Sequence, residues 1–268
     1  MQGIQETVMK RLLFYLATTL VATNLLAGYT YHFETVFSST WSKSTITGLA
    51  TVDGKKVRID FEKGDDFLFP DAGILISTDG ENFQVFDVAG KTYYDVKLGE
   101  LLNPASGMTK APDGTPIALS YANPKVDVKD NGDGGEVAGF STRKYTIHTS
   151  YDMHVSLMGK SLSNHFEIAI EVWATDKLPA SLMTFLQMQG LRRGIEDLDK
   201  LMDASPIRGF PLRQVMKHTG NYGGGRSRSW TMETTVTAVQ ESSIAASLFE
   251  PPAGYTKIAR PSPMETPK

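Results

Sequence analysis

Residues 45–96, TITGLATVDGKKVRIDFEKGDDFLFPDAGILISTDGENFQVFDVAGKTYYDV, decide the fold. Three turn signals interrupt this stretch, Asp-Gly at 53–54, Asp-Gly at 79–80 and Ala-Gly at 89–90, and apolar and polar side chains alternate between them. A two-residue turn needs positive φ at its centre, which glycine adopts without a steric cost, so an Xaa-Gly pair between alternating segments indicates a β-hairpin. The stretch therefore predicts an antiparallel meander with one apolar face.

Alternation of period two predicts further strands on both sides of the meander. Residues 29–37 place aromatic side chains on one face, residues 145–151 and 166–172 place apolar side chains on one face, and residues 210–239 suggest a late hairpin. Successive side chains of a strand point to opposite faces of a sheet, so this pattern is typical of half-buried strands. With 268 residues and 41% apolar content, the chain is predicted to fold as a single β-rich domain over residues 28–260.

Residues 180–202 carry the one good helical pattern, in which apolar residues recur at intervals of three and four. The apolar positions are Leu182, Phe185, Leu186, Leu191, Ile195, Leu198, Leu201 and Met202. Gly190 and Gly194 are predicted to bend this helix or divide it in two. Such a stripe needs an apolar surface to cover. Two interpretations stay open, a helix that caps the sheet and a lid over a cavity.

Polar stretches elsewhere are predicted to be irregular. Proline and glycine recur over residues 103–125, so no long regular element is expected in this excursion. Residues 127–136, DVKDNGDGGE, suggest a calcium loop, but its third and twelfth positions are Lys129 and Ala138, so a solvated turn is predicted instead. Residues 261–268 have the composition of a disordered tail.

The first 27 residues have the pattern of a secretory signal peptide. Lys10 and Arg11 precede an apolar run over residues 12–27, and Met9 offers an alternative start. The run is shorter than the roughly twenty apolar residues of a membrane-spanning helix. Cleavage and a periplasmic location are therefore predicted, and an uncleaved anchor in the inner membrane is the alternative. The chain has no cysteine, so an exported form would be stable without disulfides.

Composition and motifs give no sign of catalysis. The formal charge of −3 gives no reason to expect a polyanionic partner, so nucleic acid is not predicted. The sequence contains neither a Gly-Xaa-Ser-Xaa-Gly elbow nor a His-Glu-Xaa-Xaa-His pattern. His148 and His154 have no third metal ligand in a suitable spacing. We therefore predict no catalytic residue, no metal site, no cofactor and no enzymatic activity.

Several short motifs occur in an order shared with a known group of proteins. They are GLATVDGKKVRIDF at 48–61, Asp-Gly at 79–80 with KTYY at 91–94, VAGFSTRKY at 137–145, EVW at 171–173 with Leu-Pro at 178–179, GFPL at 209–212 and FEPPAGY at 249–255. In this order they resemble exported bacterial proteins of the DUF4412 type, which in turn look like the LolA/LolB group of lipoprotein carriers. The resemblance implies a mainly β fold with some α. In that fold a curved antiparallel sheet or incomplete β-barrel is covered by helices and encloses an apolar cavity.

The leading hypothesis is a periplasmic, non-enzymatic binding or carrier protein for a lipid, an acyl chain or another lipophilic ligand, including the acyl chains of lipoproteins. Burial of apolar ligand surface, at roughly 25 cal/mol per Å², needs no catalytic residue. The predicted cavity lining is Phe33, Phe37, Val57, Ile59, Phe61, Phe83, Val85, Phe166, Ile168, Ile170, Leu182, Phe185 and Leu186. The same residues could instead form a fully packed core, since apolar alternation is first of all how a sheet folds.

A second hypothesis is an envelope interaction or assembly module with a filled core. In that case an exposed edge strand, or the excursion over residues 103–125, would dock a protein of the cell envelope.

Overall fold

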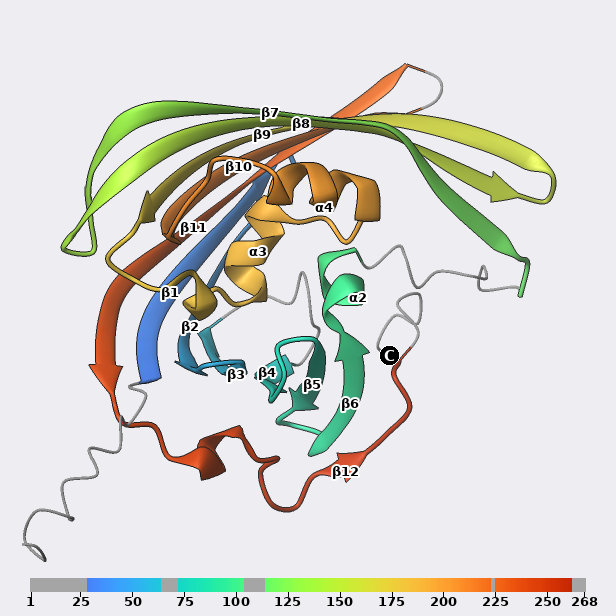
Figure 1. Cartoon of the computed structure of the whole chain (residues 1–268). Coiled ribbons are helices and arrows are strands. Elements are labelled where there is room, and N and C mark those ends of the chain that lie inside the picture. The colour runs from blue at the N-terminus through green and yellow to red at the C-terminus, as the bar shows by residue number, and fades with distance from the viewer. Residues whose placement is uncertain (1–27, 64–71, 104–113, 223–224, 262–268) are drawn as a thin grey trace, which may run out of the picture.

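The strands of the chain form one open, strongly curved sheet (Figure 1). The computed structural model describes residues 28–63, 72–103, 114–222 and 225–261. Within these residues the sheet has 12 strands in the order β12-β6-β5-β4-β3-β2-β1-β11-β10-β9-β8-β7. Neighbours are antiparallel apart from β12, which runs parallel to β6. The predicted curved antiparallel sheet is confirmed. The two edge strands of the described sheet, β12 and β7, do not pair with each other, so the sheet is open and not a closed barrel.

Five short strands make up the meander half of the sheet. They are β2 (Lys43–Asp53), β3 (Lys56–Lys63), β4 (Ala72–Ser77), β5 (Asn82–Asp87) and β6 (Thr92–Lys97). Gly54 and Gly80 take positive φ in the first two predicted turns. Val57 and Ile59 are buried on the concave face, whereas Arg58 points to the other face. The meander predicted from residues 45–96 is therefore confirmed.

Six further strands form the rest of the sheet, apart from β12 (Thr256–Lys257). They are β1 (Gly28–Ser39), β7 (Ile117–Val137), β8 (Phe140–Leu157), β9 (Lys160–Thr175), β10 (Phe210–Tyr222) and β11 (Arg226–Ser242). β1 pairs with β2 on one side and β11 on the other, so it joins the meander half to the long-strand half, β7–β11. The strands predicted over residues 29–37, 145–151 and 166–172 and the late hairpin are confirmed.

The prediction of an irregular excursion over residues 103–125 is wrong for its last part, because β7 begins at Ile117. Residues 104–113 lie outside the described part of the chain. Pro124 lacks a backbone N–H, yet the strand tolerates it because β7 is an edge strand and its pairing with β8 is already irregular at that point.

The solvated turn predicted over residues 127–136 is also strand. Gly132 and Gly135 take φ of 82° and 75°, a region that glycine adopts without strain. Their N–H groups donate to the carboxylates of Asp130 and Asp133 at 2.9 and 2.8 Å. The pairing of β7 with β8 shifts register beside both glycines. Local Asp–Gly bonds thus stabilise two bulges, and the strand continues through a sequence that resembles a turn.

The helical pattern over residues 180–202 forms three short segments. They are η2 (Ala180–Leu182), α3 (Phe185–Leu191) and α4 (Glu196–Asp203). Thr184 and Gln187 form a capping box that starts α3. Gly194 separates α3 from α4 with φ of 63°, and a Cβ added there would lie 2.7 Å from the carbonyl oxygen of Gly99. The prediction that a glycine divides this helix is confirmed.

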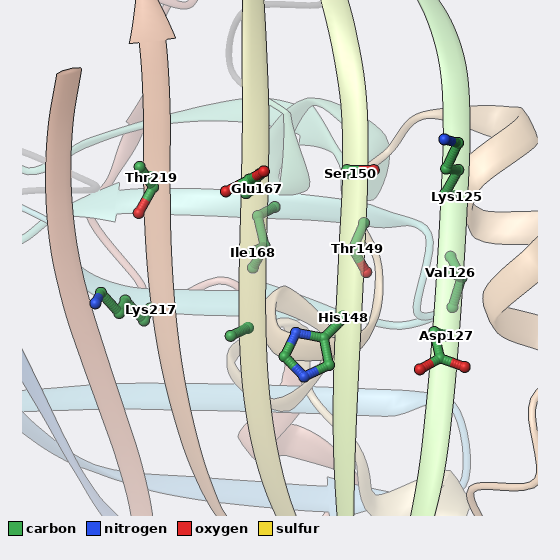
Figure 2. A pocket seen from close by; sticks show the side chains of 11 residues that line it. Lys125, Val126, Asp127, His148, Thr149, Ser150, Glu167, Ile168, Lys217 and Thr219 are labelled. Atoms are coloured by element: carbon green, nitrogen blue, oxygen red, sulfur yellow. The ribbon is translucent and has the colours of Figure 1, made fainter.

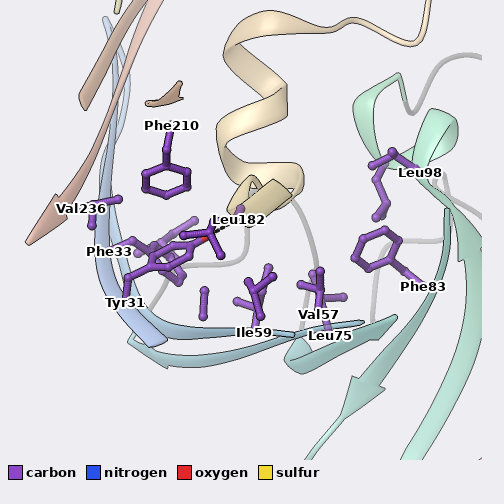
Figure 3. Packing of buried hydrophobic residues seen from close by; sticks show 14 of the residues in the cluster. Tyr31, Phe33, Val57, Ile59, Leu75, Phe83, Leu98, Leu182, Phe210 and Val236 are labelled. Carbon is purple, nitrogen blue, oxygen red and sulfur yellow. Dashed lines mark hydrogen bonds between the residues drawn. The ribbon is translucent and has the colours of Figure 1, made fainter. Parts of the chain in front are cut away.

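Two apolar clusters lie on the concave side of the sheet, where α3 and α4 are also found (Figure 1). The first joins the meander half to η2 and to α2 (Leu98–Leu102) (Figure 3). In it the buried Tyr31 hydroxyl donates to the Leu182 carbonyl at 3.2 Å and to Gln187 Oε1 at 3.0 Å. The second cluster joins the long-strand half to α4 through Leu198 and Met202. The helical segments are thus attached to both halves of the sheet.

A third cluster covers the opposite face of the meander, which the sequence did not predict. Ile76 and Phe86 pack there against Phe249 of η3 (Ala246–Phe249) and Tyr255. β12 (Thr256–Lys257) then pairs with β6. The meander is therefore apolar on both faces, because the C-terminal segment folds back over it.

The predicted signal peptide lies outside the described residues, as does the predicted tail from residue 262 onward. Within the described ranges, none of the helices has the length and apolar character needed to cross a bilayer.

Candidate functional site

A cleft of about 520 Å³ opens beside the helical segments. One wall comes from η2, α3, the end of α4 and the connection that follows it, and the other from the turn regions of the meander half and from α2. Its volume lies within the range of about 300–1,000 Å³ that is usual for small-molecule sites. The cleft lies between the predicted lid region and the sheet, where the sequence hypothesis places a ligand.

Three methionines contribute to the apolar lining of this cleft. The apolar lining residues are Val57, Leu98, Ala180, Met183, Met188, Leu191, Met202 and Ile207. Methionine is unbranched and has a polarisable thioether, so it adapts to apolar partners of different shapes. Val57 and Leu98 are buried in the first cluster and Met202 in the second. The cleft therefore has methionine side chains that can adapt to a ligand, and other lining residues that are part of the two apolar clusters.

The charged groups on the rim are mostly engaged with protein partners. Arg192 Nη2 lies 2.6 Å from Asp203 Oδ1. The Arg208 guanidinium donates to the carbonyl oxygens of Ser205 and Ile207, both at 2.8 Å. Asp79 accepts backbone hydrogen bonds in its turn, which lowers its pKa far below the ordinary value. The cleft thus combines apolar side chains with a charged rim, several of whose groups are hydrogen-bonded to the protein.

An aromatic row crosses the concave face of the long-strand half. It runs through Phe37 on β1, Trp230 on β11, His218 on β10, Phe166 on β9, Tyr151 on β8 and Tyr121 on β7. Successive ring centroids are 5.4, 4.8, 5.4, 5.3 and 6.0 Å apart. Such separations allow favourable aromatic contacts. The row links strands that are far apart in the sequence, and most of its members belong to the second cluster.

Arg193 reaches this row from the connection between α3 and α4. Its Nη2 lies 2.7 Å from the Met216 sulfur, and no ion pair joins its guanidinium to a carboxylate among the described residues. Burial lowers the pKa of the arginine. Burial, and secondarily the Arg193 cation, lower the pKa of His218 to about 4. The His218 Nδ1 atom is buried without a hydrogen-bond partner. A neutral imidazole is therefore favoured at neutral pH beside the cation.

A second hollow, of about 550 Å³, lies on the opposite face of the long-strand half (Figure 2). Lys125, Asp127, His148, Glu167 and Lys217 line it from four neighbouring strands. Charges of both signs alternate here and no apolar wall is present among the lining residues whose side chains face outward. This composition is typical of a hydrated sheet face. In the described part of the chain, no group of three or more His, Asp or Glu side chains is placed to hold a metal ion.

The predicted lining residues occupy several places. Those in the first cluster are Phe33, Val57, Ile59, Phe83, Val85 and Leu182, with Phe61 partly buried beside them. Those in the second cluster are Phe166, Ile168 and Ile170. Phe37 belongs to the aromatic row, and the side chains of Phe185 and Leu186 lie outside the described residues. Among the described ones, Val57 lines the cleft. A ligand-binding role for the set stays a prediction.

Several residues that line the cleft are absent from the predicted lining. Met183 and Met188 lie inside the predicted helical stretch but off its apolar stripe, and Ile207 and Arg208 follow the end of that stretch. The signal was present, because three methionines fall within residues 183–202.

One protein-family model matches this chain. The model of a domain of unknown function, DUF4412, matches residues 120–255, just over half of the chain. The chain belongs to the DUF4412 family. The DUF4412 match covers β8–β11, most of β7, the segments from η2 to α4 and the C-terminal segment up to Tyr255. It includes the FEPPAGY motif, whereas the motifs in the meander half lie outside it.

Several solved structures resemble this DUF4412 protein at low similarity. One, from Vibrio parahaemolyticus, is described as an outer membrane lipoprotein-sorting protein domain; it is 8% identical over 84% of this chain and 89% of that chain, with a TM-score of 0.32. A DUF1329 family protein from Desulfovibrio piger is 8% identical over 85% and 91%, with a TM-score of 0.28. PNGF-II is 12% identical over 87% and 31%, with a TM-score of 0.34. These scores carry no argument about activity. No curated protein matches the chain.

Proposed function

We propose that this DUF4412 protein is a non-enzymatic binding or carrier protein of the bacterial periplasm. Its ligand is a lipophilic group, such as the acyl chain of a lipid or a lipoprotein, and the methionine-lined cleft receives it. The observation that carries the proposal is the cleft itself, an apolar space of about 520 Å³ between the helical segments and the meander half.

The size and lining of the cleft suit part of an acyl chain. Burying about eight methylene groups at about 0.8 kcal/mol each would contribute about 6 kcal/mol, which corresponds to a dissociation constant of about tens of micromolar. The three methionines can repack around chains of different length. The predicted residues in the first cluster would then support the cleft from behind, with Val57 at its surface.

The alternative, a module that docks a protein by strand addition, finds less support. The available edge is β7, and bulges interrupt its ladder at three places. Pro124 and the neighbouring Lys125 also lie on this edge. Bulges, proline and lysine are the means by which sheets avoid pairing with other chains. The long edge of the sheet is therefore protected against strand addition.

Displacement of a fluorescent fatty-acid probe by palmitate tests the proposal. The test variant is the double substitution Met183→Gln with Met188→Gln, which keeps side-chain length but makes the cleft polar. The matched control is Met158→Gln, the same change at an exposed position. We expect palmitate to bind the unchanged protein and the control alike, and to bind the cleft variant about tenfold more weakly or worse.

Thermal unfolding of all three proteins shows whether the variants remain folded. Absence of palmitate binding to the unchanged protein, after delipidation, would overturn the proposal. Equal binding by a folded cleft variant would also overturn it, because the ligand would then lie elsewhere.

A further inference from the structure

Arg193 lies on the concave side of the long-strand half without a strong partner for its charge. It belongs to the short connection between α3 and α4, which lie on the concave side of the long strands (Figure 1), and its side chain is half-buried. A guanidinium carries five N–H donors. Among the described residues, the acceptor within hydrogen-bond distance of this guanidinium is the Met216 sulfur, 2.7 Å from Nη2. A thioether is a weak and uncharged acceptor, so most of the donors are unused.

The carboxylate of Asp199 interacts electrostatically with Arg193, but its oxygens are bonded to backbone groups. Its Oδ1 accepts from the Arg193 N–H at 2.8 Å, and its Oδ2 accepts from the Gly194 N–H at 3.0 Å. In the described part of the chain, no carboxylate forms an ion pair with the Arg193 guanidinium. A partly buried charge without a close counter-ion is unfavourable. The folded chain therefore leaves this cation without a close anion of its own.

Two further polar groups on this face lack partners. His218 Nδ1 and Thr149 Oγ1 are buried, and neither has a hydrogen-bond partner among the described residues. Both flank Ile168, which pairs with His218 on one side and with Thr149 on the other. Met216, the residue that contacts Arg193, lies two positions before His218 on the same strand. Buried polar atoms without partners are rare. Water can satisfy the two neutral atoms, but it cannot neutralise the cation.

Aromatic rings border these polar groups. Tyr151 and His218 both interact electrostatically with Arg193. The Phe166 ring lies between them, with its centroid 5.3 Å from that of Tyr151 and 5.4 Å from that of His218. The Trp230 ring stacks on His218 at 4.8 Å. Small-molecule sites usually combine apolar and aromatic walls with a few polar groups that fix the orientation of the ligand. This part of the concave face has that combination.

The charges of this region suit a ligand with a single negative charge. Arg193 supplies one positive charge, the neutral form of His218 is favoured at neutral pH, and Asp199 adds negative charge nearby. A dianion would therefore be poorly balanced. A carboxylate and a phosphodiester each carry one charge, and arginine binds such oxygen pairs through two parallel N–H···O bonds. The aromatic border favours a ligand in which this head group is attached to an apolar body.

We propose that Arg193 binds the monoanionic head group of an amphipathic ligand, whose apolar body lies against the aromatic row. This site is separate from the methionine-lined cleft, because Arg192 is among the residues that line the cleft and Arg193 is not. The inference therefore does not rest on ligand binding in the cleft, and it adds a chemical class of ligand, an amphipathic monoanion, that the cleft alone does not specify.

Isothermal titration calorimetry of the purified, delipidated protein tests this proposal with three probes of eight carbon atoms. They are octanoate, dibutyl phosphate and the uncharged 1-octanol. We expect at least one of the two anions to bind about tenfold more tightly than 1-octanol. The tighter anion identifies the head group as a carboxylate or a phosphodiester. Arg193→Met should remove the preference for anions. Arg143→Met, the same change at an exposed arginine paired with Asp130, is the matched control and should retain it.

Thermal unfolding without ligand separates binding from a structural role. Arg193→Met removes a cation that lacks a close anion, so it should unfold at the same temperature as the unchanged protein or at a higher one. Arg193→Lys provides a second variant, because lysine keeps the charge but lacks the planar pair of donors. It should weaken anion binding by a smaller factor than Arg193→Met and leave 1-octanol binding unchanged.

Three results would overturn the proposal. The first is an unchanged protein that binds the anions no better than 1-octanol. The second is a folded Arg193→Met variant that keeps the preference for anions. The third is a preference that is lost in the cleft variant, Met183→Gln with Met188→Gln, and retained in the Arg193 variants. This third result would favour the cleft as the only binding site, whereas retention of the preference in the cleft variant would show that the two proposals stand or fall separately.

Discussion

The two halves of the sheet are covered to different extents. In the meander half, short strands have apolar clusters on both faces, one against η2 and α2 and the other against η3 and Tyr255. In the long-strand half, the outer face carries polar side chains, and α4 contacts the concave face through Leu198 and Met202. Beyond the aromatic row, the strands continue to the exposed residues Leu157 and Leu162.

This difference in cover affects stability and binding in different ways. A sheet with both faces dry gains most of its stability from side chains that contact only protein. A sheet whose concave face extends beyond its cover leaves apolar area available to a ligand or a lipid surface. The meander half therefore gains stability from apolar contacts on both of its faces, and its turn regions together with α2 form one wall of the cleft proposed to bind a ligand.

The largest expected effect is a loss of stability when a buried side chain is removed from the meander half, which is covered on both faces. Phe86 is fully buried, with ring centroids of Tyr93 and Tyr255 at 5.0 and 5.3 Å. Phe86→Ala should lower the free energy of unfolding by about 3–5 kcal/mol, as measured by urea denaturation. Tyr222→Ala, at the partly buried end of the long-strand half, serves as the comparison and should cost clearly less. Equal losses would remove the distinction between the two halves.

A smaller effect on stability is expected from a change of pH, and it arises from His218 in the aromatic row. The pKa of His218 is lowered to about 4 in the folded protein from an ordinary value of 6.5. The unfolded chain therefore binds a proton first as the pH falls, so His218 contributes stability above pH 6.5 that is lost as the pH falls toward 4. The full loss amounts to at most about 3 kcal/mol.

His218→Phe isolates this contribution, because phenylalanine can keep the stacking on Trp230 and has no proton to bind. The free energy of unfolding of the variant should depend less steeply on pH between 6.5 and 4 than that of the unchanged protein. Parallel curves for the two proteins would show that His218 does not titrate in this way.

The smallest effect is expected in the exposed hairpin that joins β8 to β9. Leu162→Ser removes an apolar side chain that is 60% exposed. It should change the free energy of unfolding by no more than about 0.5 kcal/mol, since surface substitutions seldom do more. A larger loss in urea denaturation would mean that Leu162 is covered in solution and that the end of the β8–β9 hairpin is not free surface.

The sequence was informative wherever local chemistry determined local structure. The Asp-Gly turns predicted the meander, the period-two segments predicted β1, β8 and β9, and Gly194 correctly divided the helical stretch. Each of these features depends on the backbone preference of a glycine or on the alternation of neighbouring side chains. Such signals need no knowledge of distant residues.

Features that depend on distant contacts escaped prediction. β7 passes through Pro124 and two Asp–Gly bulges because β8 holds its other edge, which a local rule for turn residues cannot anticipate. The burial of Phe86 could not be predicted locally, because Phe249 and Tyr255, which cover it, lie more than 160 residues later in the chain. The cleft likewise depends on how α3 and α4 settle against the meander turns, and alternation alone cannot tell a lined space from a filled one.

The position of β1 has a consequence for the order in which the molecule can be assembled. Among the described residues β1 is the earliest strand, yet its β11 partner, Arg226–Ser242, is synthesised about 200 residues later. The cover of the meander follows later still, with Phe249, Tyr255 and β12 at Thr256–Lys257. The pairing that joins the two halves and the cover of the meander half can therefore form only late in synthesis, and contacts of such large sequence separation form slowly.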